Sequence, residues 1–439
     1  MQSKVKKKKR RLKKSVKRGC LGIIIFLLLL ALFLFYKCSP ANDLFPFDNA
    51  VQTEEEVVVE PDSVDIAIAD AVQNLILRAQ HIDTNMLAVG IYDLTRGCGI
   101  YEYHSHRKLI PASCMKLLTG IKALKQLGVD HQYSSQEYVL GNVIRDTLYG
   151  DLLLQMDDDP LLLSFAEFTQ AVKDYGISHI KGKIVFDLLR TDTLRPHHTA
   201  QPYDITYKQV PLLMKGAPRV RSEFLTSLRA AGVTYEDDTL LFNMPLTSDA
   251  EKIYQYQTPL RDVLKPMMTN SSNVKAECVL YHNKHAQDRR EDPDTSLLVS
   301  PIDFIQIEGI YDRVADFVVN DGSGLSPENR LTADFLVQLM IYAYKQPDIR
   351  KILIDEALAT PAHPVRHGSL LGRMSALCYR DRIFCKTGTL VSCGSSSLTG
   401  YAHHQNGRWF VFSIINNNSP VYDAREFQDA LCRILVAEQ

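Results

Sequence analysis

The longest apolar run in the chain covers residues 20–36, seventeen positions without a charge. This length is the short limit for a helix that spans a membrane. Residues 1–18 carry eleven Lys or Arg and no acid. Because basic flanks stay on the cytosolic side, the pattern predicts a cytosolic head at 1–19, a transmembrane anchor at 20–36, and export of the rest. A signal peptide cleaved at Ser39-Pro40-Ala41 is the alternative.

An acidic linker follows the apolar run at 37–63. Between residues 38 and 62 the chain has seven acids, three prolines and no base. Such a composition buries little apolar surface and favours an extended segment. We therefore expect a stalk between the membrane and the folded part.

Regular spacing of apolar residues begins after the linker. Helical spacing covers 63–80, and another helix is predicted from Pro111 to Gly128. A hairpin is predicted between them, at 87–93 and 99–104. Near the C-terminus, long helical spacing at 258–285 precedes three β-rich segments and a closing helix, at 382–390, 397–404, 408–416 and 422–437.

The middle of the chain has a different pattern. Residues 136–245 alternate short apolar runs with polar loops and one helical stretch near 164–175. We interpret 136–245 as a smaller β-rich domain inserted into a larger domain made of 64–135 and 246–439. The order of elements in the larger domain predicts an α/β (α+β) fold, in which a mostly antiparallel sheet is flanked by helices.

Composition and charge narrow the class of protein. The chain is 46% apolar and 23% charged, which is ordinary for a folded globular protein. Residues 38–439 hold 38 basic and 51 acidic side chains, so the basic N-terminal segment precedes a part of the chain with net negative charge. Anionic lipid is a simpler partner for that head than nucleic acid. The nine cysteines form no CxxC pair and the thirteen histidines no HExxH motif, so we expect no metal site and no cofactor.

A Ser-x-x-Lys pattern offers a nucleophile and a base on one helical face, one turn apart. The pattern occurs five times, but Ser113 and Lys116 differ from the others in context. Ser113 follows Pro111 at a predicted helix start, where free N–H groups and the helix dipole stabilise negative charge. The alternative is that Ser113 only caps the helix.

Two further motifs favour the catalytic interpretation. Ser271-Ser272-Asn273 is predicted at a helix start, and Lys386-Thr387-Gly388 on a strand. Each pattern occurs once. Gly388 has no side chain, so a substrate backbone could approach the strand closely. The order Ser-x-x-Lys, Ser-x-Asn, Lys-Thr-Gly is typical of penicillin-binding proteins and serine β-lactamases.

On these motifs the chain resembles the low-molecular-mass class C penicillin-binding proteins, which are D-alanyl-D-alanine carboxypeptidases and endopeptidases with an inserted domain. The resemblance covers nearly all of residues 66–437. It rests on the segments at 89–120, 149–162, 259–277, 320–332 and 385–390.

The resemblance implies a role for each motif residue. Ser113 is the acylated nucleophile and Lys116 its base, while Ser271 and Asn273 relay protons or hold the substrate amide. Lys386, with Thr387 and Thr389, fixes the substrate's terminal carboxylate, and Gly388 admits the substrate. The backbone N–H groups of Ser113 and Thr389 form the oxyanion hole.

The chain departs from the family pattern at Ser272, where Asp is usual, and at Cys114, where Asn is common. Pro327 replaces the Arg that commonly follows GSGLS, and Arg330 is the nearest candidate to contact substrate instead. In the family an acidic turn contacts the cleft. We therefore expect Asp157 or Asp159 to select a stem peptide that carries an amine, whereas the simpler interpretation makes this turn structural.

The implied function is a serine D-alanyl-D-alanine carboxypeptidase/endopeptidase in the periplasm, anchored in the bacterial cytoplasmic membrane. Its expected partners are peptidoglycan stem peptides, β-lactams as covalent inhibitors, and the inner membrane. A β-lactamase and a non-catalytic peptidoglycan-binding protein remain alternatives. The presence of Ser113, Lys116 and Lys386 argues against the non-catalytic alternative.

Overall fold

The structure is a computed structural model that describes residues 59–189, 192–207, 209–241, 246–285 and 300–437. The anchor predicted at 20–36 lies outside these residues. Within the described part of the chain, no helix has both the length and the apolar character needed to cross a bilayer.

The first sheet contains five strands in the order β2-β1-β10-β9-β8, and every neighbouring pair is antiparallel. The predicted N-terminal hairpin supplies β2 at one edge and β1 beside it, and the three predicted C-terminal strands supply the others. The strands are Leu87–Asp93 (β1), Cys98–Tyr103 (β2), Ile383–Leu390 (β8), Ser395–His403 (β9) and Trp409–Asn416 (β10). A mostly antiparallel sheet was predicted for the larger domain, and this sheet has that form.

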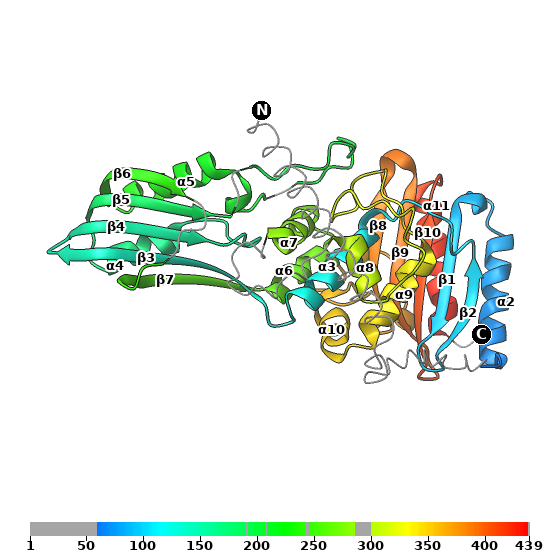
Figure 1. Cartoon of the computed structure of the whole chain (residues 1–439). Coiled ribbons are helices and arrows are strands. Elements are labelled where there is room, and N and C mark those ends of the chain that lie inside the picture. The colour runs from blue at the N-terminus through cyan, green and yellow to red at the C-terminus, as the bar shows by residue number, and fades with distance from the viewer. Residues whose placement is uncertain (1–58, 190–191, 208, 242–245, 286–299, 438–439) are drawn as a thin grey trace, which may run out of the picture. The chain divides into compact units, whose positions relative to one another are not determined.

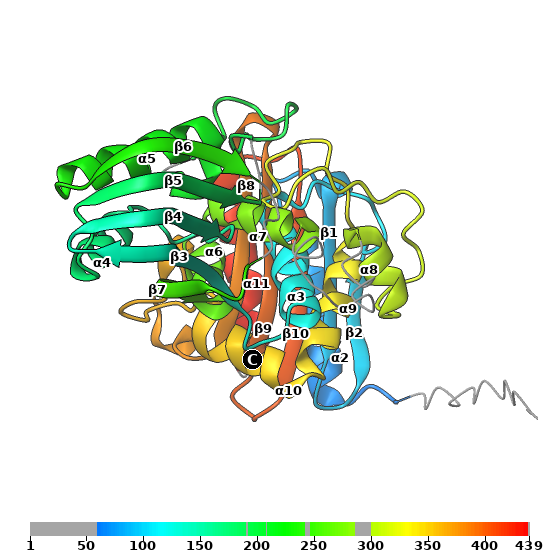
Figure 2. The ribbon, with the colours of Figure 1, turned by 60° about the vertical axis from the view of Figure 1, so that its left-hand side comes forward.

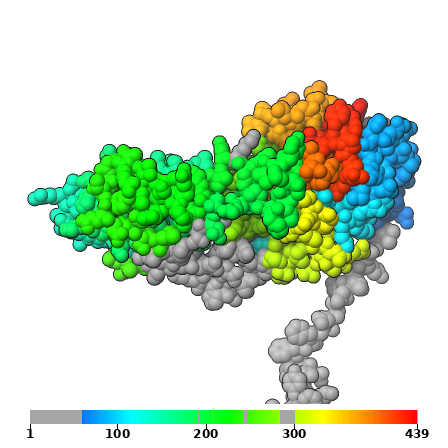
Figure 3. Space-filling model, turned by 90° about the horizontal axis from the view of Figure 1, so that it is seen from above, coloured from blue at the N-terminus to red at the C-terminus, as the bar shows by residue number. Residues whose placement is uncertain are grey.

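Helices cover both faces of this sheet (Figure 1). On one face lie Ser63–Leu77 (α2) and Val421–Val436 (α11), whose surfaces adjoin in Figure 3. Their apolar residues pack with those of the sheet, because α2 buries Ile68, Val72 and Ile76 at helical spacing. The opposite face carries Met115–Gln126 (α3), Leu260–Thr269 (α6), Asn273–His285 (α7), Pro301–Ile307 (α8), Ala333–Tyr344 (α9) and Pro347–Lys351 (α10).

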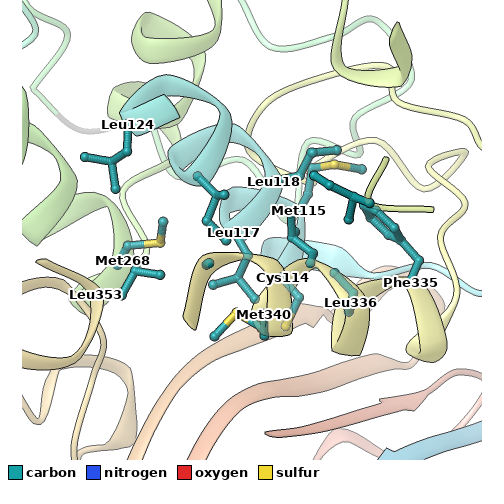
Figure 4. Close-up of a cluster of buried hydrophobic side chains, with 14 of the residues drawn as sticks. Cys114, Met115, Leu117, Leu118, Leu124, Met268, Phe335, Leu336, Met340 and Leu353 are labelled. Atoms are coloured by element: carbon teal, nitrogen blue, oxygen red, sulfur yellow. The ribbon is translucent and has the colours of Figure 1, made fainter. Parts of the chain in front are cut away.

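Helix α3 lies at the centre of the second layer. Figure 4 shows its Leu117 and Leu118 among side chains from α6 and α9, including Met268 and Met340. These side chains are fully or almost fully buried. Close packing of this kind fixes the position of a helix, because any shift opens cavities or creates clashes. The helix that follows Ser113 is therefore held firmly.

A second sheet of five strands has the order β6-β5-β4-β3-β7 (Figure 2). Its strands β4, β5 and β6 are parallel, while β3 pairs antiparallel with β4 and β7. The strands are Gln132–Ile144 (β3), Thr147–Met156 (β4), His179–Leu188 (β5), Thr234–Leu241 (β6) and Ala250–Pro259 (β7). The sheet thus uses strands on both sides of the expected boundaries at 136 and 245, and the division into domains stays a prediction.

Two helices pack on the second sheet, Ala166–Asp174 (α4) and Ala217–Ala230 (α5). Only α4 was expected. The signal for α5 is present in the sequence, because Val220, Phe224 and Leu228 recur every four residues and are fully buried.

The long helical pattern at 258–285 is two helices rather than one. α6 ends at Thr269 and α7 begins at Asn273, and Ser271 between them has a positive φ of 57°. The N–H groups of Asn270 and Ser272 both donate to the carbonyl oxygen of Pro266, at 3.3 and 3.2 Å, which closes the turn. This break places Ser271 and Asn273 beside the first sheet.

Candidate active site

Ser113 lies in a short 3-10 turn, Ala112–Cys114, directly before α3. Lys116 follows one helical turn later and is fully buried. Its Nζ is 2.8 Å from Ser113 Oγ. The three-residue offset predicted from the sequence therefore brings the two groups into hydrogen-bond contact.

The Lys116 amine has two further neighbours, Asn273 Oδ1 at 2.7 Å and the carbonyl oxygen of Ser323 at 2.6 Å. Both can only accept a hydrogen bond. An uncharged amine has two N–H donors and one lone pair, so these two acceptors leave the lone pair for the Ser113 hydroxyl. Burial, and next the positive charge of Lys386, hold the pKa of Lys116 well below its usual value. The surroundings thus suit Lys116 as a base.

Ser271 and Asn273 enter the site from the break between α6 and α7. Ser271 Oγ accepts a hydrogen bond from Lys386 Nζ at 2.9 Å, and Asn273 Nδ2 donates to Thr206 Oγ1 at 2.9 Å. The three motifs are 158 and 115 residues apart by number, yet their side chains meet in two sets of contacts: Ser113 and Asn273 with Lys116, and Ser271 with Lys386. Thr206 is a contact that the sequence did not indicate.

Strand β8 carries the third motif along the edge of the first sheet. Lys386 is fully buried, and burial lowers its pKa to about 8. A Cβ added to Gly388 would lie 3.0 Å from the backbone nitrogen of Ser113 and 2.7 Å from the carbonyl oxygen of Pro111. The strand therefore runs directly against the turn that holds Ser113, and only glycine permits this approach.

The two threonines of β8 face different partners. Thr387 Oγ1 donates to Ser369 Oγ at 2.7 Å, and Thr389 Oγ1 accepts from Arg425 Nη2 at 3.1 Å. Both lie within three residues of Lys386 on one strand. Hydroxyl and cationic donors of this kind are suited to a carboxylate.

A buried loop supports the base. Glu277 on α7 accepts hydrogen bonds from the backbone N–H groups of Gly322 and Ser323, at 3.2 and 2.9 Å. The carbonyl oxygen of Ser323 is the one that contacts Lys116. Burial, and next the charge of Asp321, raise the pKa of Glu277 to about 7. The sequence analysis did not select Glu277, although it lies one helical turn after Asn273.

Two residues of the candidate site have a strained backbone. Ala112 and Ser271 have φ values of +46° and +57°, which are unfavourable for residues with a Cβ. Strain of this kind costs about 1–3 kcal/mol per residue and persists only where the surroundings enforce it. Gly324, itself at φ +81°, packs so closely that an added Cβ would lie 1.9 Å from the Ala112 oxygen. Such strain is common at active sites.

The acidic turn lies at the contact between the second sheet and α7. Asp157 Oδ2 accepts from the backbone N–H of Ser134 at 2.8 Å, and Oδ1 is 3.4 Å from His282 Nδ1. Asp159 is fully buried and accepts from the N–H of Leu161 at 2.7 Å. Asp158 is buried too, so these two acids do not face solvent. The contacts favour a structural role, and substrate selection by Asp157 or Asp159 stays a prediction.

Arg330 is also engaged internally. Its Nη1 donates to the carbonyl oxygens of Pro327 and Asn329, at 2.7 and 2.8 Å. These contacts stabilise the end of the loop that begins at Asp321. Contact of Arg330 with substrate stays a prediction.

Over the described ranges, the side chains of His, Cys, Asp and Glu form no group of three or more that could hold a metal ion.

Comparisons with known proteins identify the family of this chain. The model of the D-Ala-D-Ala carboxypeptidase 3 (S13) family matches residues 68–213 and 205–438. The fold and the site define a low-molecular-mass class C penicillin-binding protein. The chain belongs to the D-Ala-D-Ala carboxypeptidase 3 (S13) family.

One curated relative is a D-alanyl-D-alanine carboxypeptidase of Actinomadura sp. (strain R39). It is 30% identical over 210 residues, which are 47% of this chain and 38% of the relative. The aligned part therefore spans less than half of that protein.

Solved structures share the fold at low identity. Penicillin binding protein 4 of Haemophilus influenzae has a TM-score of 0.64 and 17% identity, over 82% of this chain and 97% of that one. A predatory endopeptidase of Bdellovibrio bacteriovorus, solved with an immunity protein, has a TM-score of 0.54 and 16% identity. The match covers 78% of this chain and 88% of the endopeptidase chain.

Proposed function

We propose that the protein is a serine D-alanyl-D-alanine carboxypeptidase and endopeptidase, which cleaves peptidoglycan stem peptides through an acyl-enzyme on Ser113. The observation that carries this proposal is the 2.8 Å contact between Ser113 Oγ and a buried Lys116 amine of lowered pKa. Family membership supports the same reaction.

In the first half of the reaction, Lys116 takes the proton of Ser113, and Oγ attacks the carbonyl carbon of the penultimate D-alanine. The N–H groups of Ser113 and Thr389 hold the oxyanion. Collapse breaks the peptide bond, and the leaving amine receives a proton through Lys116 and Ser271. Water then hydrolyses the ester on Ser113 and restores the hydroxyl.

The terminal carboxylate of the substrate would lie against Lys386, Thr387 and Thr389. Lys386 supplies the positive charge, and Ser271 is held by it at 2.9 Å. Anchoring the carboxylate places the scissile carbonyl over Ser113, which lowers the barrier by orientation.

β-Lactams imitate this substrate, so they should acylate Ser113. The Haemophilus protein has been solved in complex with a β-lactam. A β-lactamase is the alternative function, and it requires rapid hydrolysis of that adduct. A stable adduct together with peptide cleavage favours the peptidase.

The place of action follows from the sequence pattern. The catalytic part would act in the periplasm, with residues 20–36 as a single membrane anchor and 1–19 in the cytosol. The supporting observation is the basic, acid-free head directly before an uncharged run.

The test uses the full chain with a fluorescent penicillin and with purified muropeptides. We expect a covalent adduct in the parent and none in Ser113→Ala. Lys116→Arg should be acylated at least a hundredfold more slowly, because arginine stays protonated. Mass spectrometry of the muropeptides should show release of D-alanine or of the cross-linked strand. Labelling that persists in Ser113→Ala would refute the nucleophile.

A further inference from the structure

A groove of about 460 Å³ begins next to the candidate active site and runs along α6. Its near end is formed by Asn270, the residue before Ser271. One wall is α6, and the other is the segment from Asp355 to Arg366. The lining residues are Lys265, Pro266, Thr269, Asn270, Asp355, Glu356, His363, Val365 and Arg366.

The second wall is connected to the carboxylate-binding strand. Gly368 packs against α6 so closely that an added Cβ would lie 2.1 Å from the carbonyl oxygen of Thr269. Ser369 then accepts a hydrogen bond from Thr387 at 2.7 Å. The segment that forms this wall therefore continues through Gly368 and Ser369 to the residues proposed to hold the terminal carboxylate.

Two cations line the groove, and they differ in their partners. Lys265 Nζ is paired with Asp262 at 2.9 Å and with Glu356 at 3.0 Å. Arg366 is half-buried, and within the described ranges no carboxylate lies within 4.0 Å of its guanidinium. Asp355 is exposed at the rim of the groove, and within the described ranges it also forms no ion pair.

The orientation of Arg366 is set by the protein. Its N–H donates to His363 Nδ1 at 2.9 Å, and its carbonyl oxygen accepts from Thr360 at 3.0 Å. Nη1 donates to the carbonyl oxygen of Ile354 at 2.7 Å. A guanidinium has five N–H donors, so most of them remain for a ligand. Burial lowers the pKa of Arg366, as expected for a cation partly removed from water.

We propose that this groove binds the leaving strand of a cross-linked stem peptide, with Arg366 as the ion-pair partner of a free carboxylate on that strand. The inference rests on the function proposed above and adds a determinant of substrate class. In an uncross-linked stem the leaving group is one D-alanine, which ends at Thr387 and cannot reach Arg366. A cross-linked strand continues past Thr387 into the groove. Arg366 would thus favour endopeptidase cleavage over carboxypeptidase cleavage.

The experiment compares kcat/KM for three substrates: a monomeric pentapeptide stem, a cross-linked dimer, and the same dimer with the leaving-strand carboxylates amidated, except the one beside the scissile bond that Lys386 would hold. The variants are Arg366→Lys, which keeps a positive charge, and Arg366→Gln, which keeps a donor for Ile354. Arg380→Gln, an exposed arginine that does not line the groove, is the matched control. Penicillin acylation reports whether each variant is folded.

We expect Arg366→Gln to lower the ratio of dimer to monomer kcat/KM about tenfold or more, chiefly through KM, and Arg366→Lys to lower it less. The amidated dimer should show no such dependence on Arg366, and the control should match the parent. The groove proposal fails if the parent cleaves the dimer but the ratio is the same in Arg366→Gln, or if the amidated dimer loses as much.

The proposed function fails separately. If the parent forms no penicillin adduct and cleaves neither monomer nor dimer, the peptidase itself is refuted, and the groove proposal with it. If the parent cleaves the monomer only, the peptidase stands and the groove proposal is overturned.

Discussion

At the scale of single residues, the site depends on a lysine kept uncharged. Lys116 is buried, contacts two obligate acceptors, and lies near a second cation, Lys386. Burial and the charge of Lys386 both disfavour the ammonium form of Lys116. The two acceptors do not, but an uncharged amine can donate to both of them. The sequence identified Lys116 and Lys386. It did not identify the two acids, Asp321 and Glu277, whose charges raise the pKa of Lys116.

Glu277 is one of these two acids, and we predict that it contributes to the pH dependence of acylation. Its negative charge raises the pKa of Lys116. In Glu277→Gln this charge is absent, so Lys116 should stay uncharged at lower pH. The rising limb of the penicillin acylation rate against pH should move to lower pH. Glu308→Gln, at the end of α8, serves as the control. An unmoved limb would contradict this role.

The variant Glu277→Gln also tests the raised pKa of the Glu277 carboxyl. Burial brings the pKa of folded Glu277 from 4.5 to about 7, so the folded state binds this proton more tightly than the unfolded state. The contribution to the free energy of unfolding is therefore largest below pH 4.5 and is lost as pH rises to about 7. The Tm of Glu277→Gln, relative to the parent, should rise by a few degrees across that interval and be constant above it.

At the scale of elements, the decisive contact is that of β8 with the turn before α3. The sequence predicted β8, α3 and the use of glycine at 388. It predicted a helix start at Ser271-Ser272-Asn273, and α7 begins there, but it did not predict the positive φ of Ser271, which only the tertiary structure determines. It also missed α5, whose apolar repeat lies within a segment interpreted as strands and loops.

We predict that Gly388→Ala lowers the rate of penicillin acylation at least tenfold. The added Cβ would lie 2.1 Å from Ser397 Oγ and 3.0 Å from the Ser113 nitrogen, a group proposed for the oxyanion hole. The strand must then move away from the turn. Gly99→Ala on β2 is the matched control, since nothing lies within 4 Å of its added Cβ. Equal rates for the two variants would show that the close approach is dispensable.

At the scale of the whole molecule, the sheet is completed by segments from both ends of the described chain. β1 pairs with β10, so residues 87–93 lie beside 409–416. Lys116 and Asn273, 157 residues apart, meet between the sheet and its helical layer. A site assembled in this way exists only when the whole fold is formed.

The proposed topology can be tested on the full chain. With Met1 in the cytosol and one membrane span, a reporter fused after Gln439 should be active only in the periplasm. The protein should remain in the membrane after high-salt and carbonate washes. Recovery of a soluble form that starts near Asn42 would show cleavage of the N-terminal segment instead.

The sequence by itself determined the chemistry. Spacing places a serine and a lysine one turn apart, because the offset of three residues is a local property of a helix, and the helix start after Pro111 distinguishes Ser113 from the other four matches. The order of the three motifs identifies the family. Local periodicity likewise predicts most strands and helices of the first sheet and its layers, whose patterns are set by one buried face.

The tertiary structure alone decided what surrounds those residues. Segments far apart in the chain supply the contacts of Glu277 and Ser323. They also decide the internal contacts of Asp157 and Asp159, and leave Arg366 with no carboxylate within 4.0 Å among the described residues. Desolvation and charge pairing are properties of position in space. A sequence names the ionisable groups, but only packing decides which of them lose water, which find a partner, and which remain free to bind a substrate.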